Sequence, residues 1–408
     1  MPNFNLPDEV FLAAAKRFGT PLYLYDEQGI RDNISELQKA FSWNKKYKQF
    51  FAIKALPNPA MLKLMAESNC GLDASSEVEL LLADMVSVSG ENLFFSANAM
   101  PKKEIKMARD RHAHINLDDI SDIDTLLSFG AVPENLCLRF NPGGVFDGEN
   151  SIMGSPGESK YGFTKEQLYL GLKKLKQKGL QGFGLHAFLS SNSQKEDYYP
   201  RLAELLISVG KELESNVQIP FEYINLSGGM GIPYKPEDKK QDIYKMAEGV
   251  KRVLQKNNCE HMAVYTEMGR YITGPYGFLL THAMHEKNIY KRYIGVDACA
   301  SNLLRPAMYG AYHHIHVAGK RESKNDFMYD ITGCLCENND KFAINRKMPK
   351  IDLGDLLIIH DCGAHAHSMG YQYNGRLRCA EVLYTKQGDF KLIRRNETPE
   401  DYFNTLVM

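Results

Sequence analysis

The sequence lacks an excess of charge of either sign, and it lacks any long apolar run. Its 49 Lys and Arg residues nearly balance its 50 Asp and Glu residues, so the formal net charge is −1. A chain with no overall field is not predicted to bind nucleic acid or a membrane surface through its charge. No stretch of about 18 consecutive apolar residues occurs, so no membrane-spanning helix is expected.

The sequence also lacks a cysteine framework and a secretion signal. Eight cysteines are scattered through 408 residues, and none forms a CxxC pair. In a chain of this length, that pattern favours reduced thiols in the cytoplasm. The opening residues MPNFNLPDEVFLAAAKRFG have no basic segment followed by a long apolar core. They predict an amphipathic helix over residues 8–18 rather than a signal peptide, and we expect a cytoplasmic protein.

What the sequence does contain is a regular alternation of strand-like and helix-length segments over residues 26–282. Eight strand-like segments each end in polar or small residues. This alternation is typical of a parallel (β/α)8 barrel of the TIM type, in which the chemistry lies at the C-terminal ends of the strands. The eight segments are 49–54, 71–75, 93–96, 114–118, 136–141, 182–188, 223–229 and 262–269.

The pattern changes after about residue 282. Short strand-like runs, several of them alternating with period two, are separated by turn-forming clusters. They predict a C-terminal antiparallel β domain of sandwich or barrel type. We expect residues 21–25 to join it, so that this second domain comprises residues 1–25 and 283–408. The predicted strands are 292–297, 314–318, 327–332, 356–360 and 380–385, with a short helix or tail over 398–407.

Lys54 ends the first barrel segment, after the apolar run Phe-Phe-Ala-Ile. A lysine at the C-terminal end of a barrel strand is placed to react with a substrate or cofactor. The alternative is that Lys54, like most lysines at strand ends, only extends its ammonium group into solvent.

The seventh and eighth segments carry groups suited to a phosphorylated cofactor. Gly228 and Gly229 belong to a run of three glycines within four residues, where backbone N–H groups can close on a phosphate. A tight turn is the alternative. Glu267, followed by Gly269 and Arg270, could hold the pyridine nitrogen of a pyridoxal ring protonated. A surface ion pair between Glu267 and Arg270 is the alternative.

The sixth segment ends in His186, whose flat imidazole can stack on an aromatic cofactor; a hydrogen-bonded core histidine is the alternative. Between the fifth and sixth segments, residues 142–160 form a loop rich in Gly, Ser and Pro. A loop of this length is usually functional or mobile.

The predicted β domain adds further candidate groups. Arg305 and Tyr309 lie close together after a strand, and an arginine suits bidentate capture of a substrate carboxylate. Cys336 lies beside Glu337, so a thiol that can carry a proton adjoins a carboxylate. A surface arginine and an inert buried cysteine are the ordinary alternatives. The histidines of GAHAHSMGYQYN match no standard zinc spacing, so no metal site is expected.

Taken together, these motifs resemble those of the fold-type III pyridoxal-phosphate decarboxylases, and most closely the diaminopimelate decarboxylases. The resemblance runs from RFGTPLYLYD to the AEVL of the last strands. It rests on FAIKAL, the glycine-rich strand, E-x-G-R, LRPAMYGAYH, CEN-x-D and YQYN. It implies pyridoxal 5'-phosphate (PLP) as cofactor, an amino acid as substrate, and a homodimer with active sites at the subunit interface.

The resemblance also implies a role for each candidate residue. Lys54 binds the cofactor covalently, His186 stacks on its ring and Glu267 bonds its pyridine nitrogen. Gly228, Gly229, Gly269, Arg270 and Tyr373 hold the phosphate. Arg270, Arg305 and Tyr309 hold a substrate carboxylate, while Cys336 donates a proton and Glu337 reads the distal amino group, both from the partner subunit.

The implied reaction is decarboxylation of meso-2,6-diaminopimelate to L-lysine and CO2, a step of lysine biosynthesis. The chain departs from the family pattern after His186, where HAFLSSNSQ replaces a shorter H-x-G-S-Q. A decarboxylase acting on another amino acid therefore stays open, with a D-amino acid, an ornithine- or lysine-like compound, or a siderophore or antibiotic precursor as its substrate. An amino-acid racemase on the same barrel and a non-catalytic PLP-binding protein are further alternatives.

Overall fold

The computed structural model describes residues 6–134, 136–146 and 154–407. The chain divides into two compact units. The first, which we call the barrel unit, comprises Asn33–Gly231 and Gln241–Tyr271. The second, which we call the β unit, comprises Met1–Asp32, Ile232–Lys240 and Ile272–Met408.

The barrel unit contains a closed barrel of eight strands, β2 to β9, and every neighbouring pair is parallel. Each strand falls on one of the eight predicted segments, so the predicted (β/α)8 barrel is confirmed. The strands are β2 (Lys48–Ala52), β3 (Gly71–Ala74), β4 (Leu93–Ser96), β5 (His114–Leu117), β6 (Leu136–Arg139), β7 (Phe183–His186), β8 (Phe221–Asn225) and β9 (Ala263–Thr266).

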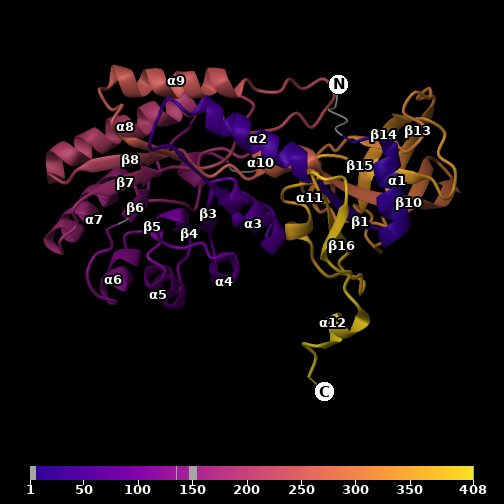
Figure 1. Cartoon of the computed structure of the whole chain (residues 1–408), viewed down its shortest axis with the longest axis horizontal. Helices are drawn as coiled ribbons and strands as arrows, with labels where there is room; N and C mark the ends of the chain where they lie inside the picture. The colour runs from indigo at the N-terminus through magenta and orange to yellow at the C-terminus, as the bar shows by residue number, and fades with distance from the viewer. Residues whose placement is uncertain (1–5, 135, 147–153, 408) are drawn as a thin grey trace. The chain divides into compact units, whose positions relative to one another are not determined.

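Helices follow the strands and lie outside the ring that the strands form (Figure 1). Several begin at a polar residue whose side chain accepts a hydrogen bond from the first turn, as Asn58, Ser76, Thr164 and Asp242 do. These helices are α3 (Pro59–Glu67), α4 (Glu77–Met85), α5 (Lys102–Asp110), α6 (Asp122–Leu127), α7 (Lys165–Gln177), α8 (Tyr198–Val217) and α9 (Ile243–Lys256).

The inside of the barrel is filled by an aromatic cluster. It consists of Phe50, Phe94, Cys137, Tyr223 and Ala263, with Tyr265 packed against it. Every member precedes the C-terminal end of its strand. The packed rings therefore close the barrel below the strand tips and leave those tips to polar side chains.

The β unit is built on a nine-stranded mixed sheet, which runs β14-β13-β11-β10-β1-β16-β17 with β15 and β12 attached at β10. The predicted antiparallel β domain is confirmed in the main, and residues 21–25 do supply a strand. Two pairs are parallel instead, namely β1 with β16 and β11 with β13. The strands are β1 (Leu22–Asp26), β10 (Gly277–Asn288), β11 (Arg292–Val296), β12 (Ile315–Val317), β13 (Phe327–Thr332), β14 (Lys341–Met348), β15 (Leu356–Ile359), β16 (Ala380–Tyr384) and β17 (Phe390–Arg394).

Three of these strands, β10, β14 and β17, were not predicted. The first five residues of β10 are all buried and its last five are exposed, so no period-two pattern marks it. The helices of this unit are α1 (Asp8–Phe18), α11 (Arg305–Tyr309) and α12 (Pro399–Phe403), and α1 matches the prediction. Two further helices, α2 (Glu27–Ala40) and α10 (Arg270–Thr273), each contain residues of both units. Among the described residues, no helix has the length and apolar character needed to cross a membrane.

Candidate active site

Lys54 lies in a single 3₁₀ turn, Ile53–Ala55, that directly follows β2. The turn is anchored by the buried residues Ile53 and Ala55, while Lys54 itself is exposed. Its Nζ lies 5.9 Å from the centre of the Phe188 ring, which follows β7. The lysine therefore projects from the mouth of the barrel, as the sequence predicted.

Glu267 is a buried carboxylate directly after β9 with hydrogen bonds to both oxygens. Asn225 Nδ2 donates to Oε1 at 2.7 Å, and Ser227 Oγ donates to Oε2 at 2.9 Å. His186 Nε2 lies 3.3 Å from the same Oε2. The barrel thus brings together His186 and Glu267, from two different strand ends, in an arrangement that favours a negative charge.

Gln49 forms hydrogen bonds with the residues on both sides of Glu267. Its Oε1 accepts from Thr266 Oγ1 at 2.7 Å and from the backbone N–H of Met268 at 3.2 Å, and its Nε2 donates to the Met268 carbonyl at 3.1 Å. Because Gln49 is buried in β2, it joins the strand that leads to Lys54 to the strand that carries Glu267. The two functional groups are held by one hydrogen-bonded unit.

The pKa values of two buried carboxyl groups at these strand ends are shifted in opposite directions. Burial acts to raise the pKa of Glu267, but His186, the positive charge of Lys54 and the Ser227 hydrogen bond outweigh it and keep the pKa below its ordinary value. Burial and the charge of Glu267 raise the pKa of Asp73 well above its ordinary value. Burial lowers the pKa of His186, so the ring is neutral near pH 7, with its Nε2 3.3 Å from Glu267 Oε2. The pKa values of these two interacting carboxyl groups are therefore shifted in opposite directions.

The glycine run after β8 is tightly enclosed by backbone. A Cβ on Gly228 would lie 2.7 Å from the Glu267 carbonyl oxygen. Gly229 has a φ of 98°, and a Cβ there would lie 2.3 Å from the Ser190 carbonyl oxygen. Only glycine fits this turn without moving its neighbours.

The loop after His186, where the sequence departs from the family pattern, packs onto this glycine turn. Ser193 N–H donates to the Gly229 carbonyl, and Gly231 N–H donates to the Ser193 carbonyl, both at 2.8 Å. A parallel bridge joins Ser193 to Met230. The loop after His186 therefore packs directly against the glycine turn.

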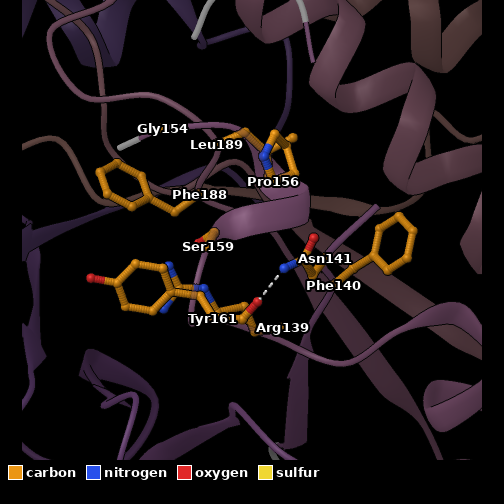
Figure 2. Close-up of a pocket in the computed structure, with 9 residues that line it drawn as sticks. All are labelled: Arg139, Phe140, Asn141, Gly154, Pro156, Ser159, Tyr161, Phe188 and Leu189. Carbon is orange, nitrogen blue, oxygen red and sulfur yellow. Dashed lines mark hydrogen bonds between the residues drawn. The ribbon is translucent and has the colours of Figure 1, made fainter. Parts of the chain in front are cut away.

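A pocket lies beside these groups, at the ends of β6 and β7 (Figure 2). Arg139, which ends β6, bonds Asp118 Oδ1 at 3.1 Å and lies 4.1 Å from the Tyr161 ring. Figure 2 also shows Asn141 Nδ2 donating to the Tyr161 carbonyl, at 2.6 Å. Phe188 lines the pocket and is also the ring next to Lys54. The predicted loop 142–160 supplies part of the wall; its residues 147–153 lie outside the described part of the chain.

The other candidate residues belong to the β unit. Arg305 begins α11 and is 3% exposed, and Tyr309 ends the same helix and is 42% exposed. Arg305 Cζ lies 4.4 Å from the centre of the Tyr234 ring, and its Nη1 lies 2.8 Å from His313 Nε2. Because Arg305 and Tyr309 are four residues apart on one helix, they share a face of it.

Cys336, Glu337 and Tyr373 come together in two joined loops of the same unit. Cys336 N–H donates to Asn374 Oδ1 at 2.8 Å, so the loop after β13 is tied to the turn that carries Tyr373. The buried Asp340 holds the first loop in shape, since it accepts from Leu335 N–H and from Ala300 N–H at 2.8 and 2.7 Å. Cys336, Glu337 and Tyr373 are all exposed.

Comparison with known proteins identifies this arrangement. Residues 27–274 match the family model described as pyridoxal-dependent decarboxylase, pyridoxal binding domain. The chain belongs to the pyridoxal-dependent decarboxylases. Its enzyme class is that of the PLP-dependent carboxy-lyases, which act on amino acids, and its cofactor is PLP, as the sequence predicted.

Curated relatives and solved structures match along nearly the whole decarboxylase chain. Protein TabA of Pseudomonas amygdali pv. tabaci is 36% identical, over 98% of this chain and 93% of its own length. Diaminopimelate decarboxylase of Methanothermobacter thermautotrophicus is 34% identical, over 95% and 91%. The structure of M. jannaschii diaminopimelate decarboxylase in complex with L-lysine has a TM-score of 0.91 at 29% identity, and the match covers 98% of this chain and 94% of that one.

The decarboxylase barrel fits PLP group by group. The cofactor carries an aldehyde, a basic pyridine nitrogen and a phosphate; the strand ends offer a primary amine, an ionised carboxylate and a glycine turn. Among the described residues, both ring nitrogens of His186 and Asp73 Oδ1 are buried without a hydrogen-bond partner. Buried polar atoms are normally paired, so these atoms indicate that a further polar group belongs beside them.

Three residues that support this decarboxylase site, Gln49, Asn225 and Ser227, were not singled out from the sequence. Asn225 and Ser227 are two residues apart at a strand end, so alternation alone would have placed both side chains on one face of that strand. Gln49 is a buried polar residue in β2, directly before the apolar residues Phe50, Phe51 and Ala52. A buried amide in such a strand is a signal of backbone hydrogen bonding.

Proposed function

We propose that this decarboxylase converts meso-2,6-diaminopimelate to L-lysine and CO2, in the cytoplasm and as a step of lysine biosynthesis. The observation that carries the proposal is the buried guanidinium of Arg305, held against Tyr234 in the β unit. A diamine-forming decarboxylase needs an acidic group for a distal ammonium and has no use for a second carboxylate site. Diaminopimelate has both an amine and a carboxylate at its distal end, which Glu337 and Arg305 would bind. The diaminopimelate decarboxylases among the relatives support the same substrate.

The barrel residues would hold PLP as follows. Lys54 would bind it covalently through Nζ, and Glu267 would keep a proton on its pyridine nitrogen. His186 would pack on its ring, while Gly228, Gly229, Gly269, Arg270 and Tyr373 would hold its phosphate. PLP supplies an acceptor for the electron pair left behind when CO2 departs.

The β-unit residues would hold the substrate and complete the reaction. Arg305 and Tyr309, together with Arg270, would bind and orient carboxylate groups. Cys336 would return a proton to the α-carbon, and Glu337 would accept hydrogen bonds from the distal ammonium. We propose that the chain is a homodimer in which the partner subunit supplies Cys336 and Glu337.

The experiment that tests the substrate is incubation of the PLP-loaded protein with meso-diaminopimelate, with lysine and CO2 quantified. Lysine and CO2 in equal amounts are expected. A protein that releases CO2 from another amino acid in a panel, and none from diaminopimelate, would refute the substrate and keep the reaction class.

A second candidate is a decarboxylase for another amino acid, and one observation favours it. The loop after His186 is longer than the family pattern and forms a wall of the glycine turn through Ser193. The curated relative TabA, at 36% identity, carries a name that states no diaminopimelate activity. The same panel, extended to D-amino acids and to ornithine and lysine, separates the two candidates.

Truncation of Arg305 should weaken substrate binding rather than chemistry. Removing one member of a buried charge pair costs about 2–5 kcal/mol, so Arg305→Ala should raise KM for diaminopimelate at least about thirtyfold, with a smaller change in kcat. Arg252, on the barrel unit with its side chain 75% exposed, is the matched control, and its alanine variant should keep the wild-type KM. An unchanged KM in Arg305→Ala would remove the carboxylate site from the proposal.

Substrate affinity should also fall at alkaline pH because of Asp361. Burial raises the pKa of Asp361 to about 8, and the charge of Arg305 lowers it only in part. Below that pH the carboxyl is neutral; above it, a carboxylate forms near Arg305 and competes with the substrate carboxylate for the guanidinium. KM should therefore rise at least about threefold between pH 7 and 9, because the interaction between the Asp361 carboxylate and Arg305 costs the substrate roughly 1 kcal/mol of binding free energy.

The control for the pH effect is Asp361→Asn, which removes the titrating group. Asparagine tolerates the φ of 58° at this position. The variant should lose the alkaline rise in KM relative to the wild-type enzyme. The same rise in both proteins would show that another group titrates.

A further inference from the structure

His313 is a fully buried histidine in the turn between α11 and β12, and both of its ring nitrogens have a partner. In its closest contacts, Nε2 lies 2.8 Å from Arg305 Nη1 and Nδ1 lies 2.8 Å from the carbonyl oxygen of His360; Cys362 Sγ lies farther from Nδ1, at 3.7 Å. The ring thus forms a bridge from the end of β15 to the arginine that begins α11. No role was predicted for this residue from the sequence.

The two contacts determine which nitrogen carries the proton. A backbone carbonyl only accepts hydrogen bonds, so Nδ1 must donate to His360. A guanidinium only donates, so Nε2 must present its lone pair to Arg305 Nη1. The geometry therefore requires the neutral ring with its proton on Nδ1, because a second proton on Nε2 would face an N–H of the guanidinium.

Tyr234 supplies the second constraint on the guanidinium. Its ring centre lies 4.4 Å from Arg305 Cζ, and the same ring packs edge-on against His313, with the centres 5.2 Å apart and the planes at 71°. Tyr234 therefore covers one face of the guanidinium, and His313 binds one of its edges. Arginine binds a carboxylate through two parallel N–H groups, so the direction of its fork decides whether both bonds can form.

The turn that carries His313 is itself fixed. β12 pairs with β15 through Ile315 and Ile359, and His360 N–H donates to the His314 carbonyl at 2.9 Å. Arg346 Nη1 donates to the His313 carbonyl at 3.1 Å. A ring held in this way can act as a fixed reference for the flexible arginine side chain.

We propose that His313 is a positioning residue, which directs the guanidinium fork of Arg305 toward the substrate carboxylate. This inference rests on the proposed function of Arg305 as the residue that binds that carboxylate. His313 itself contacts neither substrate nor cofactor in this proposal. It acts through the hydrogen bond that it accepts from Nη1.

The test compares two substitutions of His313 in the PLP-loaded enzyme. His313→Phe keeps a flat ring beside Tyr234 and removes both nitrogens. It should raise KM for diaminopimelate about tenfold or more, equivalent to about 1.4 kcal/mol, while kcat changes less than about threefold. His313→Gln can place an amide oxygen at the position of Nε2 and an N–H toward His360, so it should restore KM to within about threefold of wild type.

Two further variants separate positioning from a general loss of structure. In an Arg305→Ala background, His313→Phe should add no further rise in KM, because the group that it positions is gone. His314→Gln alters the neighbouring histidine, whose ring faces His360 with centres 5.2 Å apart, and should leave KM unchanged. Equal KM values for wild type and His313→Phe, failure of His313→Gln to restore KM, or additive effects in the double variant would each overturn the proposal.

The proposed function and the positioning role of His313 can be refuted separately. A wild-type enzyme without activity on diaminopimelate refutes the proposed function, and the positioning role falls with it. A wild-type enzyme with that activity, whose KM depends on Arg305 and not on His313, refutes the positioning role alone. If His313→Phe does not fold, His313→Met replaces it in the comparison with His313→Gln. Methionine offers Arg305 Nη1 no acceptor of comparable strength, so His313→Met should raise KM and His313→Gln should not.

Discussion

Replacement of Lys54 by alanine is expected to reduce kcat for decarboxylation by at least about 1000-fold, or about 4 kcal/mol of activation free energy. Lys54 stands at the end of β2 with its charge within reach of both Asp73 and Glu267. Without its amine, the protein has no covalent hold on the PLP aldehyde at this position. The variant should also lose its visible colour on gel filtration, and CO2 release and absorbance measure the two effects.

The matched control is a lysine at the opposite end of the same strand. Lys48 begins β2, and its Nζ bonds the side chain of Asn92. Lys48→Ala should keep the colour and a kcat close to that of wild type. If Lys54→Ala protein stayed coloured and active, the amine that binds PLP would lie elsewhere.

Replacement of Glu267 by glutamine should lower kcat about 100-fold, equivalent to about 2.7 kcal/mol. Glutamine preserves the volume and can still accept from Asn225, so the fold should persist with little change in melting temperature. What is lost is the negative charge that would hold a proton on the pyridine nitrogen of PLP. The measurement is kcat in the presence of saturating PLP.

Asp73→Asn is the control for this substitution, because it alters the neighbouring buried carboxyl. Burial and the charge of Glu267 raise the pKa of Asp73 well above its ordinary value, whereas the pKa of Glu267 is lowered, so an uncharged amide should disturb position 73 less than position 267. Its kcat should fall less than about tenfold. Equal losses from the two substitutions would contradict the opposite pKa shifts of the two carboxyl groups.

The barrel and the position of Lys54 could be predicted from the sequence for a topological reason. In a closed parallel barrel, the C-terminal ends of all strands meet at one mouth, so a residue's place at a strand end predicts its neighbours. His186 and Glu267 lie at the ends of different strands, 81 residues apart in sequence, and the structure places His186 Nε2 3.3 Å from Glu267 Oε2. To predict that these two residues are neighbours, it was enough to know where the strands end, without any knowledge of side-chain contacts.

The supporting contacts could not be predicted in the same way. Gln49 is 219 residues from Met268 in sequence, and its hydrogen bonds depend on the register of β2 against β9, which sequence patterns do not specify. Tyr234 and His313 meet Arg305 through loops rather than through periodic elements. The parallel pairing of β1 with β16 likewise joins segments from opposite ends of the chain.

Chemical trapping shows directly which lysine binds PLP. The PLP-loaded protein is reduced with borohydride and digested, and the modified peptide is identified by mass spectrometry. We expect a pyridoxyl group on Lys54, the lysine of the peptide containing FFAIKALPNPAM. A pyridoxyl group on any other lysine, with Lys54 unmodified, would contradict this expectation.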